Sequence, residues 1–325
     1  MSKKRFNGKA IYNPSGKAGE YSYWACNFYV GCSNMCEYCY CRKGILSNAL
    51  LKKCFKNETD ALAVFQEELT QNIIQLQQYG LFFSFTTDPM LEETHKLHWK
   101  AIYFAMENDV PVKILTKCVG GWIDQLRTEV HPSWKKLLAI GFTLTGHDEL
   151  EGNSASTKER IRAMADLHKA GYKTFASIEP VVDFVSAYSM ITLSRKVCDL
   201  YKIGLMSGKE YNAKERRDAE CFFEMLKGDT GQKFYLKDSL ITLLKLDRDK
   251  LPEQFVRRDY NLFDYNIGDI VPYKNSRGNV KLARITLLEK VDNGKIWFKG
   301  IDTQTGANVW YPVHISKELK KGGKP

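Results

Sequence analysis

The sequence lacks several features that would assign it to whole classes of protein. No apolar run approaches the ~20 residues of a membrane-spanning helix, so no membrane partner is expected. The basic N-terminus has no apolar segment behind it, which argues against a secretory signal peptide. Repeats and low-complexity tracts are missing as well. These absences favour a cytoplasmic protein, and 325 residues of ordinary composition suffice for one large domain and a small one.

The usual companions of a structural zinc site are also missing. Cys32, Cys36 and Cys39 stand in a C-x3-C-x2-C spacing after a short apolar run. A structural zinc site usually shows a second Cys or His pair a dozen or more residues later. Cys41 and Cys54 form no such pair, no His lies nearby, and nine cysteines fit a disulfide framework poorly. Three neighbouring thiolates can instead hold three corners of a cubane iron–sulfur cluster and leave the fourth iron open.

This spacing resembles the signature of the radical S-adenosylmethionine (radical SAM) superfamily. The resemblance implies a [4Fe–4S] cluster on Cys32, Cys36 and Cys39, whose free iron chelates the amino and carboxylate groups of SAM. Reduction of the cluster would cleave SAM to methionine and a 5′-deoxyadenosyl radical, which abstracts a hydrogen atom from the substrate. It also implies an electron donor such as flavodoxin or ferredoxin, and a reducing compartment.

Most of the chain alternates between short apolar strands and amphipathic helices. A strand at 24–30 and a helix at 59–78 come first. Predicted strands follow at 81–85, 112–116, 138–144, 173–178, 200–205 and 233–236, with helices at 94–108, 121–129, 157–170, 186–197 and 213–226. This alternation predicts a parallel sheet covered by helices. About six β/α units suit an incomplete (β/α)6 radical SAM barrel over residues 1–250, with its site at the carboxyl ends of the strands.

Residues 251–325 are predicted to form a linker and a small domain. The charged segment 245–260 shows no periodicity, whereas 267–273, 281–289, 295–301 and 309–313 alternate as strands, with turns at 275–278, 292–294 and 305–306. This pattern predicts a small C-terminal antiparallel β-barrel of the SH3-like kind.

A basic surplus makes DNA or RNA a possible partner of this small domain. The net charge is +10, and from residue 260 onward eleven Lys and Arg stand against six Asp and Glu. Basic residues beside aromatic ones suit contact with phosphates and bases. Aromatic residues are also the most expected core of so small a barrel. The residues concerned are Tyr273, Arg277, Lys281, Arg284, Trp297, Lys299, Trp310 and Tyr311.

Polar residues directly follow two of the predicted strands. Thr86, Thr87 and Asp88 come after the strand at 81–85, where they can bond the ammonium group of SAM or cap the next helix. Lys117 follows the strand at 112–116, where it can pair a carboxylate or extend to solvent. The next two strands end at Thr143 and Thr145 and at Glu179.

Thr143 and Thr145 end the strand at 138–144 and are predicted to bind the cofactor. Glu179 follows an apolar strand, where a carboxylate is costly to bury without a partner. Binding of a ribose hydroxyl, an ammonium group or a substrate by Glu179 is as plausible as a structural salt bridge.

Several segments resemble the branch of the superfamily that contains spore photoproduct lyase and the DNA repair photolyases. They lie at 11–21, 31–41, 87–89, 114–117 and 142–145, so that the resemblance covers roughly residues 10–182. It implies that Tyr38 lies against the adenine of SAM and that Thr87 and Lys117 hold its amino and carboxylate ends. Tyr38 and Tyr40 match a tyrosine pair that takes part in radical transfer in the lyase.

One position departs from this resemblance. The hydrogen-donor cysteine of the lyase falls at Phe85 here, and a phenylalanine cannot donate hydrogen as a thiol does. Cys118 or Cys41 could substitute, but such cysteines are more often inert, which argues against a thymine-dimer lyase. Three hypotheses therefore follow. The first is a radical SAM enzyme that modifies or repairs a nucleic acid, and the second is the same chemistry on a peptide, protein or small molecule. The third is a non-catalytic, zinc-stabilised nucleic-acid-binding protein.

Overall fold

The computed structural model describes residues 8–42, 51–128, 130–258, 260–264, 266, 269–291 and 295–322. The chain divides into two compact units, Met1–Leu262 and Phe263–Pro325. The division expected from the sequence lies at residue 250, and the reason for the difference is the segment that follows the last strand of the first unit.

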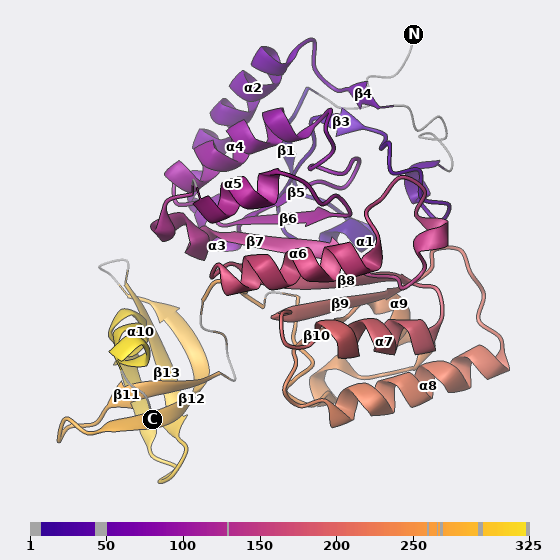
Figure 1. The fold of residues 1–325 in the computed structure, drawn as a ribbon. Coiled ribbons are helices and arrows are strands. Elements are labelled where there is room, and N and C mark those ends of the chain that lie inside the picture. The colour runs from indigo at the N-terminus through magenta and orange to yellow at the C-terminus, as the bar shows by residue number, and fades with distance from the viewer. Residues whose placement is uncertain are drawn as a thin grey trace. The chain divides into compact units, whose positions relative to one another are not determined.

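An eight-stranded sheet organises the first unit (Figure 1). β1 (Ile11–Tyr12) pairs antiparallel with β2 (Ala25–Cys26), and every later pairing in this sheet is parallel. The parallel strands that follow β2 are, in spatial order, β5 (Leu81–Phe83), β6 (Val112–Thr116), β7 (Leu138–Thr143), β8 (Lys173–Val181), β9 (Leu200–Leu205) and β10 (Phe234–Leu236). The predicted parallel sheet is confirmed. β1 and β10 form its two edges, and its closure into a barrel stays a prediction.

Two predicted elements of the first unit are divided in the structure. The strand expected at 24–30 becomes β2 and β3 (Tyr29–Val30), and β3 pairs with β4 (Lys52–Lys53) in a separate two-stranded sheet. The helix expected at 59–78 becomes α2 (Glu58–Gln71) and α3 (Ile73–Tyr79). They meet at Asn72, whose side-chain amide bonds the Glu68 carbonyl at 2.8 Å and so competes with the helix ladder.

The other helices of the unit mostly connect the parallel strands, as predicted. They are α1 (Gly16–Gly19), α4 (His95–Glu107), α5 (Trp122–Thr128), α6 (Thr157–Lys169), α7 (Phe184–Ser194), α8 (Ala213–Gly228) and α9 (Asp238–Leu243). Short 3-10 turns lie at Tyr40–Arg42, Pro132–Leu137, Asp148–Leu150 and Arg248–Lys250. Residue 129, the last of the helix predicted at 121–129, lies outside the described residues. Within the described ranges, no helix is long and apolar enough to cross a lipid bilayer.

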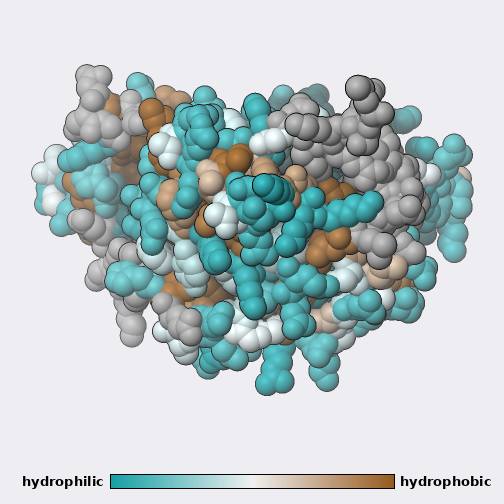
Figure 2. Space-filling model, turned by 90° about the horizontal axis from the view of Figure 1, so that it is seen from above, coloured by the Kyte–Doolittle hydropathy of each residue, from teal (hydrophilic) through white to brown (hydrophobic). Residues whose placement is uncertain are grey.

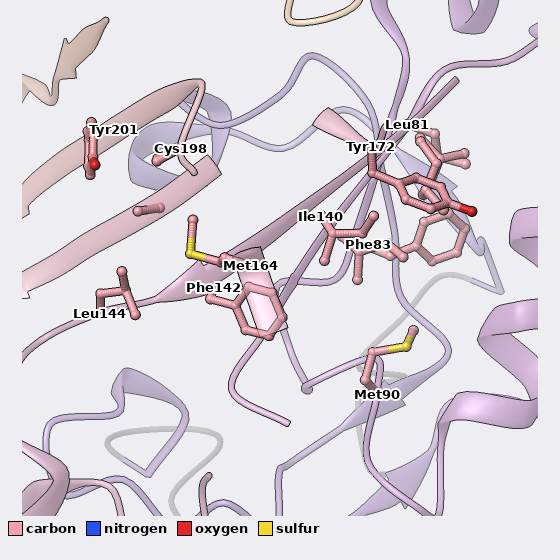
Figure 3. Close-up of a cluster of buried hydrophobic side chains, with 14 of the residues drawn as sticks. Leu81, Phe83, Met90, Ile140, Phe142, Leu144, Met164, Tyr172, Cys198 and Tyr201 are labelled. Atoms are coloured by element: carbon pink, nitrogen blue, oxygen red, sulfur yellow. The ribbon is translucent and has the colours of Figure 1, made fainter. Parts of the chain in front are cut away.

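The two faces of the parallel sheet have different partners because successive side chains of a strand point to opposite sides. Leu81 and Phe83 of β5 and Ile140 and Phe142 of β7 belong to the apolar core that the helices cover (Figure 3). The alternate positions, such as Phe82 of β5, face a cavity on the other side. On the surface shown in Figure 2, hydrophilic residues predominate and apolar ones form scattered patches.

The segment 245–260, predicted to be a linker, packs against the first unit instead. Phe255 is buried, and its ring lies 5.3 Å from that of Phe223 and 5.8 Å from that of Phe234. The Gln254 side chain donates to the carbonyl of Lys227 at the end of α8, at 2.8 Å. The linker prediction was wrong here because two buried side chains in a charged segment leave no periodic signal.

A four-stranded antiparallel sheet forms the second unit. β11 (Ile270–Lys274), β12 (Val280–Lys290), β13 (Ile296–Asp302) and β14 (Asn308–Pro312) pair in sequential order, and α10 (Val313–Gly322) follows. The four strands match the predicted ones, although the start of the first and the turn at 292–294 lie outside the described residues. α10 was not predicted, and the SH3-like barrel remains a prediction.

Candidate active site

A cavity of about 460 Å3 lies at the carboxyl edge of the parallel sheet. Its volume falls within the roughly 300–1,000 Å3 typical of small-molecule sites. Most of the residues singled out from the sequence line it, and they come from the cysteine loop and from the ends of four strands: Cys32, Cys36, Tyr38, Cys39, Tyr40, Thr86, Thr87, Asp88, Lys117, Thr143 and Glu179. Segments far apart in the sequence therefore meet here, as expected for the carboxyl ends of parallel strands.

Backbone hydrogen bonds hold the cysteine loop over this edge. The Gly31 N–H donates to the Thr86 carbonyl and the Glu37 N–H to the Leu150 carbonyl, both at 2.9 Å. The loop after β7 packs closely at Gly152, whose φ is +40°. A Cβ at that position would lie 2.7 Å from the Asn34 carbonyl oxygen, so only glycine allows this approach.

Asp88 is a clamp for the cysteine loop. Its buried carboxylate accepts hydrogen bonds from the Asn34 side chain at 2.9 Å, from the Thr116 hydroxyl at 2.6 Å and from the Lys117 N–H at 2.8 Å. It also accepts from the Met90 N–H at 3.0 Å. Because both oxygens are engaged by protein groups, Asp88 positions the loop against β5 and β6, and little of its bonding capacity is left for a ligand.

The three cysteines present their side chains to one cavity from a single short loop. Cys36 is buried and Cys32 and Cys39 are partly exposed, and the Cys39 N–H donates to the Cys36 carbonyl at 3.2 Å. Burial, followed by the charge of Asp88, raises the pKa of Cys32 to about 12. Among the described residues, no three His, Cys, Asp or Glu side chains gather as ligands of one metal ion. A cubane cluster takes each thiolate on a different iron, so its ligands stand farther apart than those of a single ion.

Two polar groups in the cavity have no hydrogen-bond partner within the described part of the chain. The Thr87 hydroxyl is buried and unbonded. The Lys117 ammonium makes no ion pair or hydrogen bond there and lies 5.5 Å from the centre of the Tyr38 ring. Burial alone would lower the pKa of Lys117, but the nearby Cys36, Glu151 and Asp88 outweigh it and raise the pKa. A buried polar group without a partner costs free energy, so both groups are suited to bind a polar ligand.

Tyr38, between the second and third cysteines, is fixed by a buried carboxylate. Its hydroxyl donates to Glu151, which also accepts from the guanidinium of Arg160. Glu151 and Arg160 are almost completely buried, and Arg160 donates further to the Thr143 carbonyl at 2.6 Å. Burial and then the charge of Glu151 raise the pKa of Tyr38, so the phenol stays protonated. This chain of bonds fixes the hydroxyl end of the Tyr38 ring beside the cavity.

Aromatic rings form a wall of the cavity around Phe85. Phe85 stacks on the buried Phe82, with ring centres 4.5 Å apart, and Tyr21 meets Phe85 edge to face at 6.0 Å. The Tyr40 hydroxyl donates to the Phe85 carbonyl. The Cys41 thiol lies 4.0 Å from the same oxygen, at the cavity wall. Cys41 is thus the cysteine that stands next to Phe85.

Glu179 of β8 is held in an ion pair with Lys237, which follows β10. This end of the cavity lies two or more strands away from β5 and β6, over which the cysteine loop is held. The Lys237 ammonium lies 2.8 and 2.9 Å from the two Glu179 oxygens, and the Tyr21 hydroxyl donates to Glu179 at 2.7 Å. Lys237 also donates to the Lys17 carbonyl at 3.1 Å. Gly204 makes room for this pair, because a Cβ there would lie 2.8 Å from the Lys237 side chain. Glu179 therefore makes a salt bridge within the protein, which was one of the two interpretations of this residue.

Two predicted residues do not line this cavity. Cys118 lies in a neighbouring groove, where its thiol is 3.8 Å from the Asn34 side chain and burial raises its pKa. Thr145 is buried, and its hydroxyl accepts from the His147 N–H at 3.2 Å. Several residues at the site were missed: Tyr21, Asn34, Glu151, Arg160 and Lys237. Of these, only Lys237 could have been recognised from the sequence, because it follows an apolar strand just as Lys117 does.

Comparisons with known proteins return distant relatives. No family model matches the chain. The uncharacterized protein MJ0683 of Methanocaldococcus jannaschii is 23% identical over 257 residues, which cover 75% of this chain and 93% of that protein.

Solved structures with a similar fold include a spore photoproduct lyase mutant with bound AdoMet and dinucleoside spore photoproduct. It is 16% identical, with a TM-score of 0.48 over 68% of this chain and 65% of the lyase. Streptococcus suis SuiB bound to S-adenosylmethionine is 12% identical, with a TM-score of 0.48 over 69% of this chain and 52% of SuiB. The chain thus spans less than two thirds of either enzyme.

Proposed function

We propose that the chain is a radical SAM enzyme of the cytoplasm that modifies or repairs a nucleic acid. The observation that carries the proposal is the meeting of Cys32, Cys36 and Cys39 with Lys117 and Thr87 in one cavity at the carboxyl edge of a parallel sheet. Three thiols suit the irons of a [4Fe–4S] cluster, and two unbonded polar groups suit the amino-acid end of SAM. When bound and reduced, such a cluster supplies cleavage of SAM to a 5′-deoxyadenosyl radical.

The residues of this chain have separable tasks in the proposal. Lys117 pairs the carboxylate of SAM, because its ammonium is protonated and has no hydrogen-bonded partner in the described residues. Thr87 accepts from the ammonium group. Tyr38 supplies an aromatic face for the adenine, held in place by Glu151. Asp88 binds no ligand and instead fixes the loop that carries the cysteines.

The substrate is assigned to the aromatic wall of the cavity, which lies between the cysteine loop and the Glu179–Lys237 pair. Phe82, Phe85 and Tyr21 offer an aromatic, apolar surface there, and such a surface suits a planar ring such as a nucleobase. The basic surplus of the chain favours an anionic polymer as the source of that base. The same chemistry on a peptide, protein or small molecule remains the second hypothesis, since an aromatic wall also suits an aromatic side chain.

The proposal is tested with protein purified without oxygen. Iron and sulfide are quantified, and 5′-deoxyadenosine is measured after incubation with SAM and dithionite, alone and with DNA, RNA or peptide extract. We expect about four irons per chain, by the composition of the cluster, and deoxyadenosine release that nucleic acid stimulates. Stoichiometric zinc without iron would establish the zinc-protein hypothesis instead. Stimulation by the peptide fraction alone would establish the second hypothesis.

A further inference from the structure

The four-stranded sheet of the second unit has two faces of different composition. α10 packs against one face (Figure 1), where the core of the unit forms from Val271, Tyr273, Ala283, Ile285, Phe298 and Val309. Tyr273 and Tyr311 therefore belong to the core or its edge, as the structural interpretation of the aromatic residues expected. Among the described residues of this unit, no helix or strand covers the other face.

The strand register gathers apolar and basic side chains on that uncovered face, here called the outer face. Arg284 of β12 stands between Ile270 of β11 and Ile301 of β13. In the next row, Lys299 of β13 stands between Leu287 of β12 and Trp310 of β14. Ile270, Leu282, Leu287, Ile301 and Trp310 are 40–49% exposed, which is unusual for so many large apolar residues of one small sheet.

Two tryptophans and a lysine form the centre of the outer face. The rings of Trp297 and Trp310 are stacked, with centres 5.4 Å apart and planes 27° apart. The Lys299 ammonium lies 5.2 Å from the Trp310 ring. It also lies 3.3 Å from Glu289, but both side chains of that ion pair are about half exposed, so the pair is weak and readily exchanged.

The positive charge of the second unit favours an anionic ligand for the outer face. Eleven Lys and Arg stand against six Asp and Glu from residue 260 onward, and Lys299 and Arg284 alternate with the apolar side chains on the face itself. A ligand that offers flat apolar groups and regularly spaced negative charges fits this arrangement. We infer that the outer face binds single-stranded nucleic acid, with bases stacked on Trp297 and Trp310 and phosphates beside Lys299 and Arg284.

A duplex fits the outer face less well. Its bases are stacked on one another, and their flat faces are not available to Trp310. A purely electrostatic surface would bind a duplex at least as tightly as a single strand, because the duplex has the higher charge density, whereas aromatic stacking selects unpaired bases. The inference does not rest on the radical chemistry, because it uses no residue of the cavity.

The first test measures anisotropy of fluorescent oligothymidylate and oligouridylate of about 16 nucleotides, the upper site size of small nucleic-acid-binding barrels, with the full chain. We expect Trp310→Ala to weaken binding on the order of tenfold, because stacking is worth roughly 1–3 kcal/mol per base. Trp310→Phe should retain most of the affinity. Ile296→Ala is the matched control, since Ile296 is 41% exposed but lies at the end of the sheet on the opposite side of β13.

The second test uses the salt dependence of binding. Lys299→Ala should lower the slope of log affinity against log salt by about one, the value for a lost phosphate contact. Arg277, one of the contact residues suggested by the sequence, lies in the exposed turn between β11 and β12 and outside the paired rows of the outer face. Arg277→Ala therefore removes the same charge but should leave the slope closer to that of the parent.

Three results would overturn the inference: equal binding of duplex and single strand by parent and Trp310→Ala, no oligonucleotide binding at low salt, or self-association in sedimentation that Trp310→Ala abolishes. The last would make the face a protein interface. Deoxyadenosine formation is measured on the same preparations. Failed oligonucleotide binding with intact SAM cleavage would contradict only this inference, and the reverse would contradict only the proposed function.

Discussion

The two ends of the cavity use the same kinds of side chain in opposite ways. At the cysteine end, Lys117 and the Thr87 hydroxyl have no hydrogen-bond partners in the described part of the protein. At the other end, Lys237 and Glu179 bind each other and are bonded further to Tyr21 and a backbone carbonyl. A lysine that follows a parallel strand is therefore not by itself a ligand-binding residue. Its bonding state separates a group held ready for a ligand from one that holds the fold together.

The largest effect is expected from removing a cysteine of the loop. Cys36→Ala should abolish iron retention and deoxyadenosine formation, because the cluster needs one thiolate on each of three irons and the fourth iron is left for SAM. Iron content, visible absorption and product are measured together. Cys221→Ala is the control, since Cys221 is an exposed residue of α8. An unchanged iron content in Cys36→Ala would contradict the assignment of Cys36 as a cluster ligand.

Breaking the ion pair at the other end should affect stability. Lys237→Met leaves the carboxylates of Glu179 and Glu20 without their cation. The loss is costly because the Lys237 side chain is only 2% exposed. Removal of one partner of a buried pair typically costs about 3–5 kcal/mol, so the free energy of unfolding in urea should fall by roughly that amount. The double variant Lys237→Met, Glu179→Gln should recover part of the loss. A stability equal to that of the parent would contradict the structural role.

The fold could be predicted from the sequence where side-chain periodicity is strong. β6 and β9 have the predicted bounds, since five or six apolar-rich residues between turns leave little ambiguity. The helix break at Asn72 and the burial of Phe255 could not be predicted, because each depends on contacts made only in the folded chain. α10 was missed because its C-terminal half is strongly basic, which is also typical of an unstructured tail.

The site could be predicted only in part, for a similar reason. Charged residues after apolar strands are visible in the sequence, which led to Lys117 and Glu179 but gave no means of telling their bonding states apart. Arg160 lies on a charged helix and has the pattern of a solvent-exposed residue, yet it is completely buried beside Glu151. Positions of this kind depend on how a loop and a helix meet, and single-sequence reasoning has no access to that.

Lys117→Met sharpens the comparison because it changes the same residue type at the cysteine end. A lost charge-assisted hydrogen bond to a carboxylate is worth roughly 1.5–3 kcal/mol, so the Kd for SAM should rise about 10- to 150-fold. The loss of unfolding free energy should be smaller than that of Lys237→Met, since no hydrogen bond within the protein is broken. SAM binding is measured by calorimetry on protein with full iron content. A larger stability loss than in Lys237→Met, with SAM affinity retained, would reverse the assignment of the two ends.

His98 is a buried ionisable group of the first unit that differs from both lysines. Lys117 is available to bind a ligand, and Lys237 is held in an ion pair within the fold. His98 is fully buried among the rings of Phe28 and Phe83, and its Nδ1 lies 2.9 Å from the Thr94 carbonyl. Burial lowers its pKa from 6.5 to about 4, with hydrogen bonds to the backbone of Thr94 and Pro89 opposing the shift. Its Nδ1 is hydrogen-bonded, unlike the Lys117 ammonium, whereas its Nε2 is buried without a hydrogen-bond partner among the described residues.

The smallest effect is therefore expected at this histidine, in stability and not in ligand binding. As pH falls below 6.5 the unfolded chain takes up a proton before the folded chain does, so stability is full above that value and is lost on the way to about 4. Between neutral pH and about 5.5, the parent should lose roughly 1 kcal/mol more than His98→Phe. Urea unfolding at both pH values measures this, with SAM affinity as the second readout. Equal pH dependence in the two proteins would mean that His98 is protonated in the fold and has a counter-charge, which would place it with Lys237.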